Sequence, residues 1–311
     1  DLGVEREFGG LVLDWGRRHP ANYDVETSLD GSDWRTVRAV RGSNGARDPL
    51  PLAESEARFV RIQIRPDIPR RNGSAGADSV RDAGGESERW GDQGVELREL
   101  LVMPLEWGAS AEAFFRRLAR ETPRGLYPRG ILGEPVQWTL VGPGDGNVHE
   151  GLLDTDGRLE TGKACWSVEP FLYAGGRLLT WNELRFHPSL LDGDLPIPMV
   201  EGREEDPRRL LQDDPPILSA DRQAKDLRLV VTAFATDRAL IARYLVRNGG
   251  KSPRSATLYL ALRPFQVNPP AQFLNTPGGV APISGIRREG RTVLVNDAPG
   301  NKALGADVAD Q

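Results

Sequence analysis

The stretch that decides the fold is residues 23–37, which read YDVETSLDGSDWRTV. Its first part alternates apolar and polar side chains, the pattern of a half-buried β-strand. Asp30-Gly31 follows as a strong turn signal, and alternation resumes from Trp34 to Val37. A strand, a tight turn and a second strand in so short a stretch predict an antiparallel β structure.

Similar patterns flank this stretch, so residues 1–103 as a whole read as β structure. Residues 10–15 are an apolar run, and residues 95–102 close the set. In residues 58–64, Phe59 is alone at an odd position and Val60, Ile62 and Ile64 occupy even positions, which predicts an even core face. Residues 66–94 between the last two strands are polar and rich in Gly and Arg, which predicts a long loop.

One convincing helix is expected at residues 110–121. Ser110 is a suitable N-cap, and Pro123 ends the pattern. The apolar stripe at helical spacing consists of Ala111, Phe114, Phe115 and Leu118. We interpret this helix as a connector between two domains.

β character returns from about residue 131. The expected strands are 136–141, 164–173, 177–181, 227–234, 239–247 and 256–265. Gly175-Gly176 and Asn248-Gly249-Gly250 mark turns, and the charged, Pro-containing residues 201–225 predict an exposed loop. Frequent turns and dominant strands favour two β-sandwiches over α/β layers.

The sequence therefore predicts an all-β fold of two β-sandwich domains joined by a short helix. The expected parts are a first sandwich at 1–105, a helical linker at 106–130, a second sandwich at 131–300 and a frayed tail at 301–311.

Composition narrows the class of protein. The 311 residues are 39% hydrophobic and 27% charged, as in globular domains, and no run of residues is long and apolar enough to span a bilayer. A formal net charge of −5 disfavours a nucleic-acid partner. Cys165 is the single cysteine, which excludes an internal disulfide and favours a buried apolar role, and the three histidines show no metal-binding spacing.

The N-terminal third resembles a discoidin-type domain, the coagulation factor 5/8 type C module. The residues that carry the resemblance are 1–3, 8–10, 23–34, 57–62 and 95–100. It implies a jelly-roll β-sandwich that binds sugars or lipid head groups through loops at one end, and it suggests an extracytoplasmic location. The family's first strands, which precede the segment matching residues 1–3, are missing from this chain. The resemblance also places Glu99 where some of these modules bind a structural calcium ion, which needs 6–8 oxygen ligands.

Residues 131–300 resemble the β-sandwich domain that precedes an (α/α)-barrel in some bacterial glycosidases and sugar phosphorylases. The residues that carry this second resemblance are 166–171, 243–248 and 258–265. In that family the barrel performs the acid/base chemistry. The resemblance thus implies a following catalytic domain in a larger parent protein.

Aromatic residues divide into expected core and expected site residues. Trp15, Trp34 and Phe59 lie in alternating strands and are expected in the core. Trp90 lies in a polar loop, where a flat ring can stack on a sugar, and Arg89 and Asp92 can supply hydrogen bonds beside it.

Residues 263–275 are the second candidate binding segment, because amides and aromatics alternate there with prolines that stiffen the chain. Such a segment suits sugar recognition, or equally a dry contact with a following domain. Its candidate ligand-binding side chains are Arg263, Gln266, Asn268, Gln272 and Asn275.

The leading hypothesis is a carbohydrate-binding or accessory region of a glycoside-active protein, without catalytic machinery or a cofactor of its own. One alternative is a glycosidase that uses carboxylates of the second sandwich, for which the candidates are Asp154, Asp156, Glu160 and Glu169. Turn or rim positions are the simpler expectation for these four residues. The other alternative is a structural interaction module.

Overall fold

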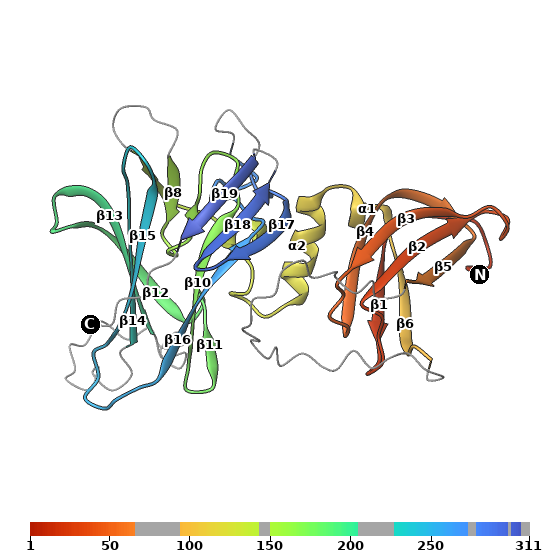
Figure 1. Ribbon diagram of the computed structural model, residues 1–311, viewed down its shortest axis with the longest axis horizontal. Helices are drawn as coiled ribbons and strands as arrows, with labels where there is room; N and C mark the ends of the chain where they lie inside the picture. The colour runs from red at the N-terminus through yellow and green to blue at the C-terminus, as the bar shows by residue number, and fades with distance from the viewer. Residues whose placement is uncertain (66–93, 143–149, 205–226, 273–277, 298–299, 306–311) are drawn as a thin grey trace. The chain divides into compact units, whose positions relative to one another are not determined.

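The computed structural model describes residues 1–65, 94–142, 150–204, 227–272, 278–297 and 300–305 (Figure 1). The chain divides into two compact units, an N-terminal unit of Asp1–Phe114 and a C-terminal unit of Phe115–Gln311. Strands dominate both units and every strand pairing is antiparallel, so the predicted all-β class is confirmed. Among the described helices, none is long and apolar enough to cross a membrane.

The N-terminal unit is a sandwich of two three-stranded sheets, with strand orders β4-β1-β6 and β3-β2-β5. Its strands are β1 Arg6–Trp15, β2 Asn22–Ser28, β3 Arg35–Arg41, β4 Arg47–Ala57, β5 Phe59–Ile64 and β6 Leu97–Met103. Residues 23–37 form most of the β2–β3 hairpin, in which Val25 pairs with Arg38.

The core of this unit follows from the two-residue period of its strands. Leu11, Leu13 and Trp15 alternate along β1 and meet Tyr23 and Val25 of β2 in one buried cluster. The even positions of β5 pack against the same cluster, as their alternation predicts.

The opposite face of β1 is covered by a short helix that the sequence did not reveal. Helix α1, Leu105–Gly108, buries Trp107 completely. A Cβ atom at Gly10 would overlap the indole of Trp107, so the glycine of β1 makes room for this helix.

Helix α2, Ala111–Glu121, confirms the helix predicted at residues 110–121, and the boundary between the two units falls within it. Ser110 caps it, since its Oγ accepts a hydrogen bond from the Ala113 N–H at 3.0 Å. A second short helix, α3 at Arg129–Leu132, follows between Pro128 and the left-handed Gly133.

The described residues of the C-terminal unit form three sheets. The first has the order β11-β10-β9-β8-β7, with β16 also paired to β10, and the second has the order β12-β13-β14-β15. Its strands are β7 Trp138–Val141, β8 Gly151–Asp154, β9 Leu159–Glu160, β10 Ser167–Ala174, β11 Arg177–Leu179, β12 Leu184–Leu191, β13 Leu195–Glu204, β14 Leu227–Ala235, β15 Leu240–Asn248 and β16 Ala256–Arg263. A third sheet joins β17 Ile283–Glu289, β18 Thr292–Asp297 and β19 Gly300–Gly305.

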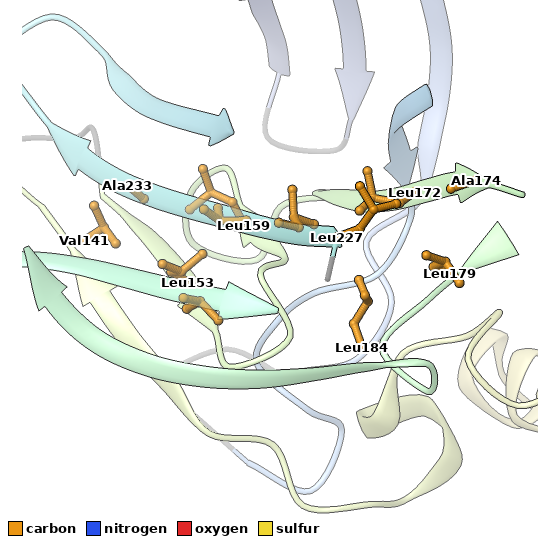
Figure 2. Close-up of a cluster of buried hydrophobic side chains, with 12 residues drawn as sticks. Val141, Leu153, Leu159, Leu172, Ala174, Leu179, Leu184, Leu227 and Ala233 are labelled. Atoms are coloured by element: carbon orange, nitrogen blue, oxygen red, sulfur yellow. The ribbon is translucent and has the colours of Figure 1, made fainter. Parts of the chain in front are cut away.

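The main core of this unit lies between its first two sheets. Leu153, Leu159 and Leu172 from the first sheet meet Leu227 and Ala233 from the second (Figure 2). The third sheet contributes to a separate cluster with Trp166 and Val168, in which Val295 is fully buried.

Three expectations differ from the observed elements. Ala164 and Cys165 precede β10 in a turn, because Cys165 N–H donates to Gly162 O and the strand begins only at Ser167. The strands β15 and β16 on either side of the glycine turn belong to different sheets. Residues 300–305, expected in a frayed tail, pair with β18 as β19.

Candidate ligand-binding regions

The outer face of β2 carries two carboxylates that arginines cover. Arg41 Nη2 lies 2.6 Å from Asp24 Oδ1, and Arg65 Nε donates to Asp24 Oδ2 at 2.6 Å. Arg61 Nε donates to Glu26 Oε2 at 2.7 Å. Burial alone would raise the pKa of Asp24, but the hydrogen bonds and charges of the two arginines outweigh it and lower this pKa. This face is a paired charge network with partly exposed guanidinium groups.

Two aromatic residues expected in the core lie instead under arginines at the surface. Trp34 is half-buried, and the Arg61 guanidinium lies 4.0 Å from its ring centroid. Phe59 is also half-buried, with the Arg58 guanidinium 5.1 Å away. Phe59 lies on the side of β5 that faces away from the core, and Trp34 precedes β3, so the prediction was wrong for both and right for Trp15. Cation–π stacking explains why aromatics are stable there.

The structure describes Glu99 but not four other predicted site residues. Glu99 is exposed on β6, opposite Asp14 of β1. Within the described ranges, no three His, Cys, Asp or Glu side chains gather as a metal-binding group, and the calcium site stays a prediction. Four predicted residues lie outside the described part of the chain: Arg89, Trp90, Asp92 and Asn275.

In the second candidate segment, Arg263 is held by the fold on several sides. Its Nη2 donates to Leu126 O at 2.8 Å, and its guanidinium lies 4.9 Å from the Phe265 centroid and 5.4 Å from that of Tyr127. Its Nη1 lies 3.5 Å from Glu169 Oε2. The described contacts of Arg263 therefore attach residues 126–127 to β16.

A buried carboxylate anchors the middle of the same segment. Glu160 Oε2 accepts hydrogen bonds from the N–H groups of Val267 at 2.7 Å and Asn268 at 3.1 Å. Burial raises the pKa of Glu160, although these N–H groups act in the opposite direction. Gln266 is buried as well, and its Nε2 donates to Val280 O at 3.3 Å. Residues 265–269 of this segment are therefore an internal part of the C-terminal unit.

Asn268 also lines a cavity of about 210 Å³. The other lining residues are Leu140, Glu150, Gly151, Leu152, Glu160, Lys163 and Ala164. Gln272 is exposed and its Oε1 accepts a hydrogen bond from Trp138 Nε1 at 3.1 Å. The structure thus brings one predicted amide, Asn268, to a cavity and leaves another, Gln272, at the surface.

Asp154 and Asp156 lie at the turn after β8, whereas the other two candidate carboxylates lie in strands β9 and β10. Asp154 has the turn role that was expected, because its Oδ1 accepts from the N–H groups of Asp156 and Arg158. Its side chain is nevertheless buried, and its Oδ2 accepts from Arg158 Nε at 2.9 Å. Glu160 and Glu169 are buried in strands, so the rim expectation was wrong for both.

Besides Glu160, two of these carboxylates have raised pKa values, Glu169 and Asp156. Burial raises the pKa of Glu169 to about 7, against the opposing charges of Arg263 and Arg158. Burial and the neighbouring Asp154 charge raise the pKa of Asp156, although Arg129 Nε donates to its Oδ2 at 2.7 Å. They lie around a polar cavity of about 10 Å³, which is about the size of one water molecule.

Sequence reasoning missed the cationic partners in this cluster. Arg158 is as buried as Asp154, and Arg129 stacks over the Trp181 ring at 4.1 Å. The spacing of Asp154 and Arg158 could have suggested a pair, but charged residues so close in a turn usually face solvent. Cys165 is buried, as the sequence analysis predicted.

Comparisons with known proteins concern the N-terminal unit. Residues 1–77 match the model of the F5/8 type C domain family, which confirms the resemblance to a discoidin-type domain. A search of curated proteins finds no match. The resemblance of residues 131–300 to the domain that precedes an (α/α)-barrel stays a prediction.

Two solved structures from a chitosanase/glucanase of Paenibacillus sp. IK-5 are similar to part of the chain. Chitosan-binding module 2, in complex with chitotriose, is 21% identical over 32% of this chain and 63% of that one, with a TM-score of 0.24. A selenomethionine-labelled mutant of chitosan-binding module 1 is 22% identical over 20% of this chain and 49% of that one, with a TM-score of 0.19. The matched region spans less than two thirds of either module.

Proposed function

We propose that the chain is a carbohydrate-binding accessory region of a larger glycoside-active protein. The observation that carries the proposal is the match of residues 1–77 to the F5/8 type C domain family, together with the two-sheet sandwich of the N-terminal unit. Loops at one end of such a sandwich are supported by a rigid scaffold, which is where binding residues usually lie.

Two regions are proposed to contact the sugar. The first is the predicted loop site of Arg89, Trp90 and Asp92. The second is the cavity lined by Asn268, with Gln272 at the surface nearby in the sequence. The volume of this cavity, about 210 Å³, exceeds the ~150 Å³ of a cavity that accepts benzene, which supports a ring-sized ligand.

The experiment is calorimetric titration of the full chain with a panel of soluble oligosaccharides, including chito-oligosaccharides, cello-oligosaccharides and xylo-oligosaccharides. Binding to at least one class is expected, and Trp90→Ala should weaken it about tenfold. Trp34→Ala is the matched tryptophan control, because that ring is already stacked under Arg61. Absence of binding to every glycan would contradict the proposal and leave a structural interaction module.

The proposal also includes a catalytic domain elsewhere in the parent protein. This part rests on the resemblance of residues 131–300 to a domain that precedes a helical barrel. The gene provides the test, because a region that encodes a helical barrel is expected after residue 311. An unrelated downstream sequence would contradict the catalytic domain and leave the proposed carbohydrate binding untouched.

A glycosidase centred on the C-terminal unit is the second candidate, because two raised pKa values meet at one polar cavity. A volume of about 10 Å³ has no room for a sugar ring. Release of reducing sugar from the same oligosaccharides, lost in Glu169→Gln, would favour this candidate. No release by the wild-type chain would reject it.

A further inference from the structure

The outer face of the sheet formed by β11, β10 and β16 carries exposed aromatic side chains. Tyr173 of β10 is 44% exposed, Tyr259 of β16 is 52% exposed and Leu178 of β11 is 38% exposed. Exposed large apolar groups that gather on one face mark interaction surfaces more often than scattered ones do.

The strand register places these side chains together. Tyr173 pairs directly with Leu178 on one side and with Thr257 on the other. Tyr259 pairs with Phe171 and is thus the diagonal neighbour of Tyr173, a separation of about 7–8 Å in antiparallel sheets. We call the group Tyr173, Leu178 and Tyr259 the tyrosine face.

The tyrosine face lies on the side of β10 that points away from the main core. Leu172 and Ala174, on the opposite side, belong to that core together with Leu179. Farther along the same outer side, Phe171 and Glu169 are almost fully buried. One end of the outer face is therefore covered and the other end is open.

We propose that the tyrosine face binds a neutral polysaccharide chain by stacking its sugar rings on Tyr173 and Tyr259; this rests on the proposed carbohydrate-binding function and gives it a second surface. A pyranose ring presents C–H groups on its faces and hydroxyls at its edge. A tyrosine presents an apolar ring and a polar hydroxyl, so both parts of the sugar meet a complementary group.

The chemistry and size of the face favour a sugar over a protein. Tyr173, Leu178, Tyr259 and the adjacent Thr257 carry no formal charge, which suits a neutral ligand. A stable protein interface buries about 800 Å² on each partner and involves about 20–30 residues a side, far more than this group offers.

The test is affinity electrophoresis of the full chain in gels that contain hydroxyethyl cellulose, xylan or chitosan. Retardation of the wild type is expected in at least one gel. The double variant Tyr173→Ala/Tyr259→Ala should bind that polysaccharide at least about tenfold more weakly. Tyr173→Phe/Tyr259→Phe keeps both rings and should remain within about threefold of wild type. Equal loss in the Phe and Ala variants would overturn stacking as the mode of binding.

A matched control and a second background separate this inference from the proposed function. Leu190→Ala/Leu195→Ala removes side chains that are 40% and 42% exposed on β12 and β13, and should leave retardation unchanged. In a Trp90→Ala background, residual binding that depends on the two tyrosines supports the tyrosine face. Complete loss in that background overturns it while the proposed function stands.

Two further outcomes would overturn the inference. If no gel retards the wild type, the proposed function fails and the inference fails with it. If light scattering shows a wild-type dimer that Tyr173→Ala/Tyr259→Ala converts to a monomer, the face binds a second copy of the chain instead.

Discussion

Both units contain carboxylates paired with arginines, but the pairs differ in solvent exposure. On β2 of the N-terminal unit, Asp24 is covered by Arg41 and Arg65, whose side chains are 53% and 44% exposed. In the C-terminal unit, Asp154 and Arg158 are both only 3% exposed. The arginines around Asp24 lower the pKa of that carboxylate, whereas burial raises the pKa of Glu169, which lines the same small cavity as Asp154 and Arg158.

The difference teaches that solvation of the arginine decides what such a pair contributes. An exposed guanidinium keeps most of its water and neutralises the carboxylate without a large desolvation cost. In a buried pair both the carboxylate and the guanidinium lose their water, so removing one partner leaves an unpaired charge in the interior. The predictions below test this contrast, in order of decreasing effect.

Arg158→Ala should destabilise the C-terminal unit by about 3–5 kcal/mol, because Asp154 would remain buried without its partner. Urea unfolding followed by tryptophan fluorescence measures the change. Arg65→Ala is the matched control on β2. Similar losses in the two variants would remove the distinction between the units.

Glu160→Ala should destabilise the chain by about 3 kcal/mol, because the Val267 and Asn268 N–H groups would lose their charged acceptor. Glu160→Gln retains an oxygen acceptor and should cost less than half as much in the same urea assay. Equal costs would show that packing, and not the hydrogen bonds, explains the loss.

The stability of the C-terminal unit should fall as pH rises from about 5 to about 7.5, by roughly 2 kcal/mol. The folded pKa of Glu169 is about 7 and its ordinary value is 4.5, so the folded state holds this proton more tightly than the unfolded state does. The stabilisation is complete below 4.5 and is lost as pH rises through 7. Urea midpoints across this range measure it, and Glu169→Gln should flatten the slope.

The N-terminal carboxylate has the opposite dependence. The pKa of Asp24 is lowered from 3.8, so its contribution is present above that value and disappears as pH falls below it. This acid loss of stability should therefore be unchanged in Glu169→Gln. If Glu169→Gln also leaves the dependence of stability on pH between about 5 and 7.5 unchanged, groups other than Glu169 cause that dependence.

Arg61→Ala should have the smallest effect, about 1 kcal/mol or less, because its pair with Glu26 is partly exposed and its stacking on Trp34 is at the surface. Adding about 1 M NaCl should reduce even this difference, since salt screens exposed pairs. A loss above about 2 kcal/mol in the urea assay would contradict the surface role.

Much of the fold was predictable because strand patterns report burial directly. The alternation in residues 23–37 and the even positions of β5 correctly gave strands and a core face. Helix α2 was predictable from its cap and stripe. Helices α1 and α3 were not, since four residues are too few to show a helical period.

The candidate site was predictable only in part. Asn268 was identified from its amide-rich segment and lines a cavity, but its anchor Glu160 lies more than a hundred residues earlier. The tyrosine face joins residues of three strands, and alternation within one strand cannot show which other strand lies beside it. Exposure of Tyr173 and Tyr259 required the sheet order.

The sequence by itself determined the strand periodicity, the turns and the resemblance of residues 1–77 to a discoidin-type domain, because these depend on neighbours along the chain. Only the tertiary structure decided which carboxylates are buried with which arginines. Burial depends on what packs across the sheets, and that packing sets the desolvation that separates Glu169 from Asp24.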